Sequence, residues 1–503
     1  MFNTIFLKEV RDHLLTFRFS AALITTFILI VISVWVLGDD YLRRLNAYNR
    51  ASDLYAQEAR EVYVPSRIIP QVHRSPSPLS IFAQGETRHL GNSVTIRRWT
   101  IPSRATDNFT DNELLAAYPS FDLLTVFTLV ISIFGLLLTY DSLSGERENG
   151  TLKQMYCNSV SRSTIFAAKF LAGVMVIAIP FLISFLSALI ILQFIHGISF
   201  TGQMWLSVFV MLTIGLVFGA IFIAIGLLSS SIFRRSSISL VFSLLLWALG
   251  VLIIPIAANA VSTTVVELSP QWEIDDFAKE TRREIRQNRP DFGVDRVSIW
   301  GSIGGQYQSL FDSNPSGFLW VEKFINYTEP AYYRRAEQIR NLENQHMQKK
   351  KQQSQLSFWL SLPAPATHLR TAFTTLASTD YSTHMRFMEH ARRFRSQMID
   401  IFRSKNYLTT NTSEFVSRRT PEERTQAGWE QRLAKYREMQ TSGQKIGWDT
   451  EFEPLPPDTI PPFSFNSFEP DFLSALEPIT ALIITLIIIF LVGYVAFLRY
   501  DVR

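Results

Sequence analysis

Six stretches of the sequence are apolar over enough residues to cross a bilayer, whose hydrocarbon core takes about 20 residues of helix. They contain almost no charged side chains and are apolar on every face, so a buried helix of a water-soluble core explains them poorly. The six stretches are Phe17–Leu37, Phe121–Tyr140, Ala168–Phe194, Met204–Leu228, Ser237–Ala260 and Leu476–Leu498. The sequence therefore predicts an all-α polytopic membrane protein with six transmembrane helices.

Two long polar segments separate these spans, which explains why the mean hydropathy of the 503 residues is only +0.12. One lies between spans one and two, and the other, between spans five and six, is expected to form a large, mainly helical domain. The chain thus divides into an N-terminal interfacial helix with span one, the first polar segment, spans two to five with a connecting loop at 141–167, the large domain, and span six with a short tail. In residue numbers these parts are 1–38, 39–120, 121–260, 261–475 and 476–503.

Basic residues gather on one side of the predicted spans. If the six helices alternate in direction, the short segments on the side of both termini carry all of the flanking Lys and Arg, whereas the loop His196–Gln203 carries none. The flanking residues are Lys8, Arg11, Arg18, Arg147, Lys153, Arg162, Lys169, Arg234, Arg235, Arg499 and Arg503. The positive-inside rule then places both termini in the cytoplasm and both polar segments outside it. We expect a multi-pass protein of the bacterial cytoplasmic (inner) membrane.

Span one is expected to remain in the mature chain. It is longer than the apolar part of a signal peptide, and Gly38-Asp39-Asp40 follows it instead of a small-residue cleavage site. We interpret it as an uncleaved anchor.

The cytoplasmic loop after span two has the most informative pattern. Glu146, Arg147 and Glu148 are followed by Asn149-Gly150, which is typical of a break in a helix. Thr151 can cap a short helix over Leu152–Tyr156, whose apolar members are Leu152, Met155 and Tyr156. A short helix between two breaks, across the cytoplasmic ends of two spans, is well placed to dock with another protein.

This loop resembles type-2 ABC transporter permeases. The similar residues are Glu146-Arg147-Glu148-Asn149-Gly150-Thr151-Leu152, Val160-Ser161-Arg162 and Lys169-Phe170-Leu171, with Ser159 where the family usually has Pro and Ala168 where it often has Gly. The resemblance implies that the short helix is a coupling helix that receives a separate ATPase subunit. It also implies an interfacial helix before span one, for which Phe2–Phe19 is suitable.

The resemblance assigns the loop residues to coupling. Glu146 and Glu148 would make ionic contacts with the ATPase, while Leu152, Met155 and Tyr156 would form an apolar plug. Arg147, Gly150, Thr151 and Arg162 complete the predicted coupling site. The single cysteine, Cys157, lies in the same region and is interpreted as structural.

The large domain has a second similar pattern. Leu362-Pro363-Ala364-Pro365-Ala366, Leu376-Ala377-Ser378-Thr379-Asp380 and His384-x-x-Phe387 resemble permeases with a large extracytoplasmic insert between spans five and six. Ser378 stands where that subgroup usually has Gly. We expect helices over Asp380–Lys405 and Val321–Lys351.

The chain shows no pattern for catalysis. It has no G-x-x-x-x-G-K-[ST] phosphate loop, so ATP and Mg are expected in a partner subunit and no cofactor in this chain. One cysteine excludes a disulfide framework, and His384 and His390 lie six apart, on different helix faces, so they do not form the i,i+4 metal pair. A net charge of +4 is too small to indicate nucleic-acid binding.

Three ionisable residues near the bilayer are expected at the outer ends of the spans. Asp122, His196 and Glu477 all occupy such positions, and none lies near a predicted midplane. An ionisable residue inside the membrane is by default a functional candidate, so this distribution argues against a transporter driven by protons or sodium.

Gly215-x-x-x-Gly219 in span four allows a helix to approach closely. A dimer interface is one interpretation of this pair, and packing within the chain is the favoured one.

The function predicted is the permease subunit of an ATP-driven type-2 ABC exporter. Its partners would be a cytoplasmic ATP-binding subunit, a second permease chain, identical or related, and membrane lipid. The alternative is a mechanotransmission complex in which ATPase motion acts on a periplasmic or envelope protein and no cargo crosses. A passive receptor is disfavoured by the docking loop, and the sequence does not indicate the cargo.

Overall fold

The computed structural model describes most of the chain. The described residues are 2–58, 69–86, 90–97, 100–106, 122–152, 154, 160–290, 315–405, 420–423, 425–443, 456 and 461–499. Helices dominate this part, and six of them are long and apolar enough to cross a membrane, which confirms the predicted all-α polytopic class.

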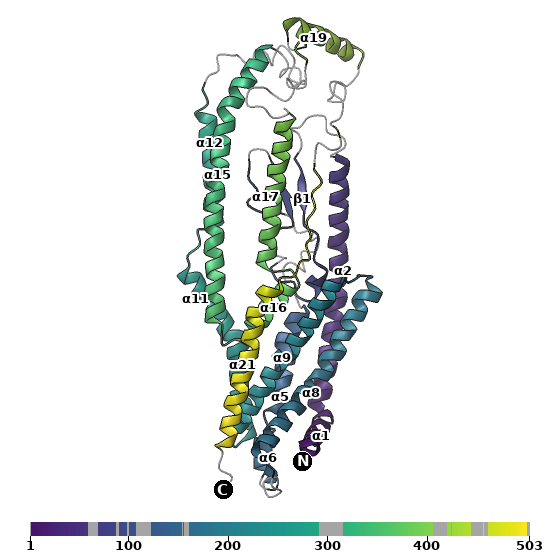
Figure 1. The fold of residues 1–503 in the computed structure, drawn as a ribbon, viewed down its shortest axis with the longest axis vertical. Coiled ribbons are helices and arrows are strands. Elements are labelled where there is room, and N and C mark those ends of the chain that lie inside the picture. Colours follow the sequence, from purple (N-terminus) through teal and green to yellow (C-terminus); the bar gives the residue numbers. More distant parts are fainter. Residues whose placement is uncertain are drawn as a thin grey trace.

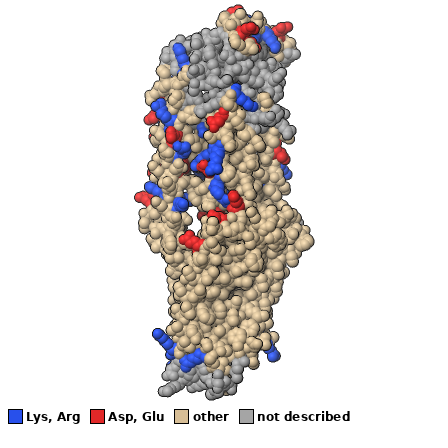
Figure 2. Space-filling model, viewed as in Figure 1, with Lys and Arg blue, Asp and Glu red and all other residues tan. Residues whose placement is uncertain are grey.

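The six spans stand side by side in the lower half of the molecule (Figure 1). Two are interrupted by a π-helical turn, and the third span ends in one. Their elements are α2 (Phe17–Glu58); α4 (Leu123–Val126), η3 (Phe127–Ile131) and α5 (Ser132–Thr139); α8 (Arg162–Ile190) and η4 (Ile191–Ile195); α9 (Gly202–Ile232); α10 (Ser236–Ala248), η5 (Leu249–Ile253) and α11 (Ile254–Val265); and α21 (Phe472–Leu498). Figure 2 shows Lys and Arg at the lower end and charges of both signs in the upper half, with an uncharged band between them.

A separate short helix precedes span one. The helix α1 (Phe2–Leu14) packs against α8 and ends five residues before the predicted Phe19. Thr16 makes the break, because its hydroxyl donates to the His13 carbonyl and accepts from the Phe19 amide.

The first membrane helix is much longer than predicted. We expected span one to end at Leu37, but α2 continues to Glu58, a length of about 63 Å at 1.5 Å per residue. Asp39 and Asp40 do not end the helix, since each carboxylate pairs with an arginine four residues on, Arg43 and Arg44. Gly38 is needed for a close approach, because a Cβ there would lie 2.7 Å from the ring of His196.

The helix α9 forms the centre of the membrane part. It packs against α5, α8, α10 and α21. Of its most apolar 18 residues, 67% are buried, whereas the corresponding share is 17% in the fifth and in the sixth span. Small residues allow this packing: a Cβ on Gly226 would lie 2.2 Å from Thr139 Oγ1. Thr139 uses that hydroxyl to donate to the Ile223 carbonyl of α9, at 3.1 Å.

The outer domain combines both polar segments with the end of α2. Its elements are β1 (Gln71–His73), η2 (Pro78–Ile81), β2 (Ser93–Thr95), α12 (Gln271–Gln287), α15 (Pro315–Leu360), α16 (Pro365–Leu376), α17 (Tyr381–Ser404) and α19 (Gln426–Thr441). The strands pair antiparallel, with Val72 opposite Val94. These two valines share a core with Phe387 and Met388 of α17, and Tyr55 of α2 packs against it. In Figure 1, α12 and α15 form a tall pair beside this body.

Two helices of the domain were predicted from the sequence, one with nearly the observed bounds and one shorter than observed. The helix α17 begins and ends one residue inside the predicted Asp380–Lys405, whereas α15 extends the predicted Val321–Lys351 at both ends. Ser378, in the turn between α16 and α17, has a positive φ of 55°. That left-handed conformation favours glycine, which explains why the similar permeases usually have Gly there.

The close contact at Gly226 gives a test of the packing. We expect Gly226→Ala to push Thr139 aside and to lower the free energy of unfolding by about 1–3 kcal/mol, the usual effect of overpacking. Gly202→Ala is the matched control on the same helix, because nothing lies within 4 Å of its added Cβ. Thermal unfolding of the detergent-purified protein measures both; equal midpoints would contradict the packing.

The outer domain should lose stability in acid through His384. Burial, together with the positive charges of Arg74 and Lys350, lowers the pKa of His384 to about 3, from about 6.5 for a free histidine. Between these values the unfolded chain binds a proton that the folded chain does not, so stability falls as pH falls, by at most about 1.4 kcal/mol per pH unit. His384→Gln should flatten the dependence of the unfolding midpoint on pH between about 6.5 and 4. Identical slopes for the two proteins would contradict this assignment.

Candidate functional site

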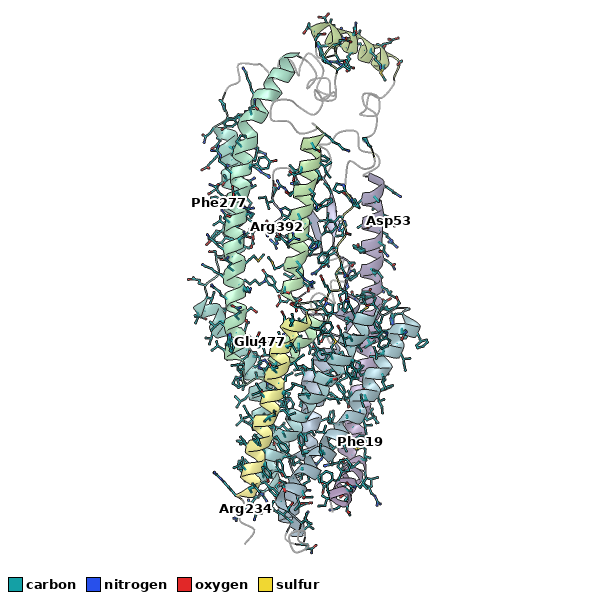
Figure 3. The ribbon with its side chains drawn as sticks, viewed as in Figure 1. Phe19, Asp53, Arg234, Phe277, Arg392 and Glu477 are labelled. Atoms are coloured by element: carbon teal, nitrogen blue, oxygen red, sulfur yellow. The ribbon has the colours of Figure 1, made fainter. Side chains whose placement is uncertain are left out.

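At the end of the molecule that holds both termini, the spans converge on the short helix α6 (Ser144–Glu148), which follows span two. Figure 3 places the labelled Arg234, in the turn between α9 and α10, at this end of the molecule, far from the labelled Asp53 of α2. The region contains Glu146, Arg147 and Glu148 of the predicted coupling site.

The start of α6 is fixed to α9 by one serine. Ser230 Oγ accepts hydrogen bonds from the backbone amides of Leu143 and Ser144, both at 2.8 Å. Amides at the start of a helix have no partner within the helix, so a buried hydroxyl from α9 satisfies them here. The position of α6 therefore depends on that of α9.

Arg147 and Glu148 hold α6 to the turn between α9 and α10. The Arg147 guanidinium donates to the carbonyls of Ser231 and Phe233, at 2.9 and 3.0 Å, at the C-terminal end of α9. The Glu148 carboxylate accepts from the backbone amide and hydroxyl of Ser236, at 3.0 and 2.9 Å, at the start of α10. The helix dipole favours a positive charge at the C-terminal end of α9 and a negative charge at the start of α10, so both side chains have the favourable sign.

A buried lysine joins α1, α6 and α8. Lys169 Nζ lies 2.8 Å from Glu9 Oε1 and 2.9 Å from Glu146 Oε1, and its side chain is 1% exposed. A buried charge is stable only when it is paired and hydrogen-bonded. The ionic contact expected between Glu146 and an ATPase stays a prediction; the structure shows this carboxylate paired within the chain.

The sequence offered only a partial signal for this cluster. Lys169 is one of the residues on which the family resemblance rests, and Glu9 lies in a charged N-terminal helix. Nothing in the pattern pairs residues that are 160 positions apart. The one available clue is a lysine inside the apolar stretch that begins at Ala168, where an unpaired charge would be costly.

Arg18 connects the start of α2 to the end of span two. Its guanidinium donates to Asp141 Oδ2 at 2.8 Å, to the Tyr140 hydroxyl at 2.9 Å and to the Leu137 carbonyl at 3.1 Å. The base of the longest helix in the protein is thereby bonded to the segment that leads into α6.

The turn after α6 is open to solvent. Gly150 has a φ of 73°, nothing lies within 4 Å of an added Cβ, and Thr151 is exposed. Leu152 differs from the expected plug residue, since its side chain is 2% exposed and so is covered within the chain. Met155, Tyr156 and Cys157 lie outside the described residues. Arg162 is at the start of α8, where its guanidinium donates to the Leu498 carbonyl at the end of α21.

The glycine pair of span four packs inside the chain. A Cβ on Gly215 would lie 2.5 Å from Phe181 Cζ, and one on Gly219 would contact Ile131 and Ile177. Both glycines are buried, so the structure shows the favoured interpretation, internal packing, and a dimer contact through these residues is not retained.

Asp122, at the outer end of span two, has structural contacts. Asp122 caps α4 by accepting from the Thr125 amide, and it also accepts from the Gln84 amide, both at 2.9 Å. In the described part of the chain, no group of three or more His, Cys, Asp and Glu residues is arranged to hold a metal ion.

Comparison with known proteins identifies one family. The family model described as ABC-2 family transporter protein matches residues 3–502, nearly the whole chain. No curated protein matches the sequence significantly.

The buried lysine can be tested by charge removal. Lys169→Ala leaves the carboxylates of Glu9 and Glu146 buried without their cation, which typically costs about 3–5 kcal/mol. We therefore expect a large fall in the unfolding midpoint in detergent. Replacing all three groups, as Glu9→Gln, Glu146→Gln and Lys169→Met, should restore most of it, because no unpaired charge remains.

Lys279→Ala is the control for this experiment. Lys279 also pairs with a carboxylate, Asp276 at 2.8 Å, but its side chain is 75% exposed. Removal of such a surface pair should leave the midpoint unchanged. A triple variant as unstable as Lys169→Ala would show that the charges are not the reason for the loss.

Proposed function

The chain belongs to the ABC-2 transporter family as a multi-pass membrane subunit, and on this basis we propose that a separate cytoplasmic ATP-binding subunit drives it through α6. The partner would bind ATP and Mg and hydrolyse ATP. The observation that carries this proposal is the number of spans bonded to one short cytoplasmic helix. Through Ser230, Ser236 and Lys169, α6 is tied to α9, α10 and α8.

Because of these bonds, a displacement of α6 would also displace the spans to which it is bonded. A free loop pressed by a partner would yield without moving the membrane part. A helix whose amides, charges and ends are all bonded to neighbouring spans transmits a displacement to them instead. The buried charges of Lys169 and Glu146 strengthen this effect, because separating them in an apolar environment is costly.

The exposed turn from Asn149 to Thr151 is the surface proposed to meet the ATPase. Two roles then follow for the predicted residues. Gly150 and Thr151 would contact the partner, whereas Glu146, Arg147 and Glu148 would position α6 within the chain. This arrangement refines the ionic contacts expected from the sequence.

We propose that the complex is an exporter in the bacterial inner membrane, with both termini in the cytoplasm and a second permease chain completing the pathway. The concentration of Lys and Arg at the end of the molecule opposite the outer domain supports this orientation (Figure 2). Membership of the subgroup with a large outer insert stays a prediction.

Mechanotransmission is the second candidate, and α2 favours it. One uninterrupted helix carries Arg18, bonded beside α6, and Tyr55, packed on the core of the outer domain. A movement at the cytoplasmic face could therefore reach a periplasmic or envelope protein without any cargo crossing. ATPase stimulation by a soluble envelope protein would favour this function, and stimulation by a cargo in liposomes would favour export.

A strained turn gives the test of coupling. Gly150→Val places a β-branched side chain at a positive φ, so the turn after α6 should change shape while no packing contact is lost. We expect the ATP-binding subunit that co-purifies with the wild-type chain in mild detergent to be recovered poorly, or with lower ATPase activity.

Gly443→Val is the matched control for Gly150→Val. Gly443 also has a positive φ, 72°, and nothing within 4 Å of an added Cβ, but it follows α19 in the outer domain. It should leave the ATPase association intact. Failure of the wild-type chain to retain any ATPase subunit, or equal behaviour of the two variants, would contradict the proposal.

A further inference from the structure

A small pocket lies where the outer domain meets the membrane part. It measures about 290 Å³, including the space open at its mouth, and its enclosed part has room for about one water molecule. Its walls come from α2, from the segment between β1 and η2, from η2, from the residue before β2, from the turn between α16 and α17, and from the segment before α21. The lining residues are Arg44, Arg74, Ser75, Pro76, Ser77, Ser80, Asn92, Ser378 and Ser467.

The pocket has an excess of positive charge. Arg44 is neutralised by Asp40, whose carboxylate lies 2.9 Å from Arg44 Nε. Arg74 is 3% exposed, and no carboxylate of the described residues lies within ion-pair distance of it. Burial lowers the pKa of Arg74 to about 10, with Asp380 opposing that change, so the guanidinium is still charged at neutral pH. A buried cation without a partner anion is unfavourable.

The hydrogen-bond donors of Arg74 are only partly used. Its Nε and Nη2 donate to Asn92 Oδ1, at 3.2 and 2.8 Å. Its Nη1 is buried and has no acceptor in the part of the chain that the structure describes. The buried Ser80 hydroxyl likewise has no hydrogen-bond partner among the described residues.

The other hydroxyls also leave donors available. Ser378 Oγ accepts from the Glu469 amide, so its own proton is free, and Ser75 and Ser467 bond to each other, which leaves one of their two protons free. The proton of the Ser77 hydroxyl is already used, because it is donated to the Ala377 carbonyl. The one amide oxygen in the lining, on Asn92, already accepts twice from Arg74. A pocket with spare donors on a buried guanidinium and on hydroxyls, and with an excess of positive charge, favours an anion.

We propose that this pocket binds a phosphate group, with one anionic oxygen placed between Arg74 Nη1 and the hydroxyls of Ser80 and Ser378. Several donors converging from different directions suit a group with several acceptor oxygens. Because the enclosed part is small, the rest of the group remains in the mouth of the pocket.

The depth of the pocket favours a phospholipid as the source of the phosphate. Arg44 lies seven residues beyond Leu37, the predicted end of the apolar stretch, which is about 10 Å along α2. The headgroup layer on each side of a bilayer is about 5–8 Å thick. The Cα of Arg44 lies just beyond this layer, but its guanidinium pairs with Asp40, which is about 5 Å beyond Leu37 and so at the level of the headgroups. A lipid held there would fix the base of the outer domain to the membrane surface.

Two measurements on the full chain test the site, in a maltoside detergent and a gluconate buffer that contain neither phosphate nor chloride. Inorganic phosphate should raise the unfolding midpoint, because a ligand that binds only the folded state stabilises it. Native mass spectrometry should show phosphatidylglycerol bound in preference to a galactolipid that lacks phosphate.

Two variants remove the site, and one is a control. Arg74→Gln removes the charge. Ser378→Gly removes a donor and also relieves the positive φ, so it should fold at least as readily as the wild type. Both should weaken phosphate binding at least tenfold. Arg335→Gln removes a similarly buried arginine, one bonded to the Ala278 carbonyl outside the pocket, and should leave binding unchanged.

Each result identifies or excludes a ligand. Selective retention of phosphatidylglycerol, lost in both variants, supports the lipid headgroup; stabilisation by inorganic phosphate alone supports a free phosphate. Equal stabilisation by chloride and phosphate would overturn the proposal in favour of a simple halide site. No response to either probe, or an equal response in Arg74→Gln, would also overturn it.

Discussion

The pairing of Lys169 with two carboxylates is the interaction on which the lower end of the membrane part depends. Its side chain is only 1% exposed, so the charge is stable there only while Glu9 and Glu146 remain in contact with it. Each of the three groups comes from a different helix, and none of those helices can move alone without exposing an unpaired charge. The fold therefore uses the cost of burying charge to make α1, α6 and α8 a single mechanical unit.

The helix α2 and the packing on α9 form a rigid connection between the membrane part and the outer domain. A helix of 42 residues that is bonded at its base and packed at its upper end behaves as a rod. The glycines of α9 bring its backbone against α5 and α8 so closely that side chains interlock. Export and mechanotransmission both need such rigid connections, and they differ only in what the outer domain does with the movement.

The sequence predicted the spans well because hydrocarbon thickness sets their length, and the helix at 381–404 because its periodicity is local. It failed where distant residues decide. Gly38-Asp39-Asp40 has the pattern of a helix end, but Arg43, Arg44 and His196 make it the middle of a helix. In the loop after span two, Leu152 is buried, Glu146 pairs with Lys169, and Arg147 and Glu148 bond to the ends of α9 and α10. The coupling role of this loop stays a prediction. No single-sequence pattern contains those contacts.

The basic residues around Lys169 and those around Arg74 differ in the partners that the chain provides for them. At the end of the molecule that holds both termini, Lys169 has two carboxylates, Arg147 two carbonyls and Arg18 an aspartate within the chain. These contacts hold the neighbouring helices in position. Around Arg74, by contrast, a buried cation and two hydroxyls keep donors with no acceptor among the described residues. Buried polar groups are seldom left in this state unless water, an ion or a ligand completes them. The surplus of donors and of positive charge at the foot of the outer domain favours a negatively charged group there.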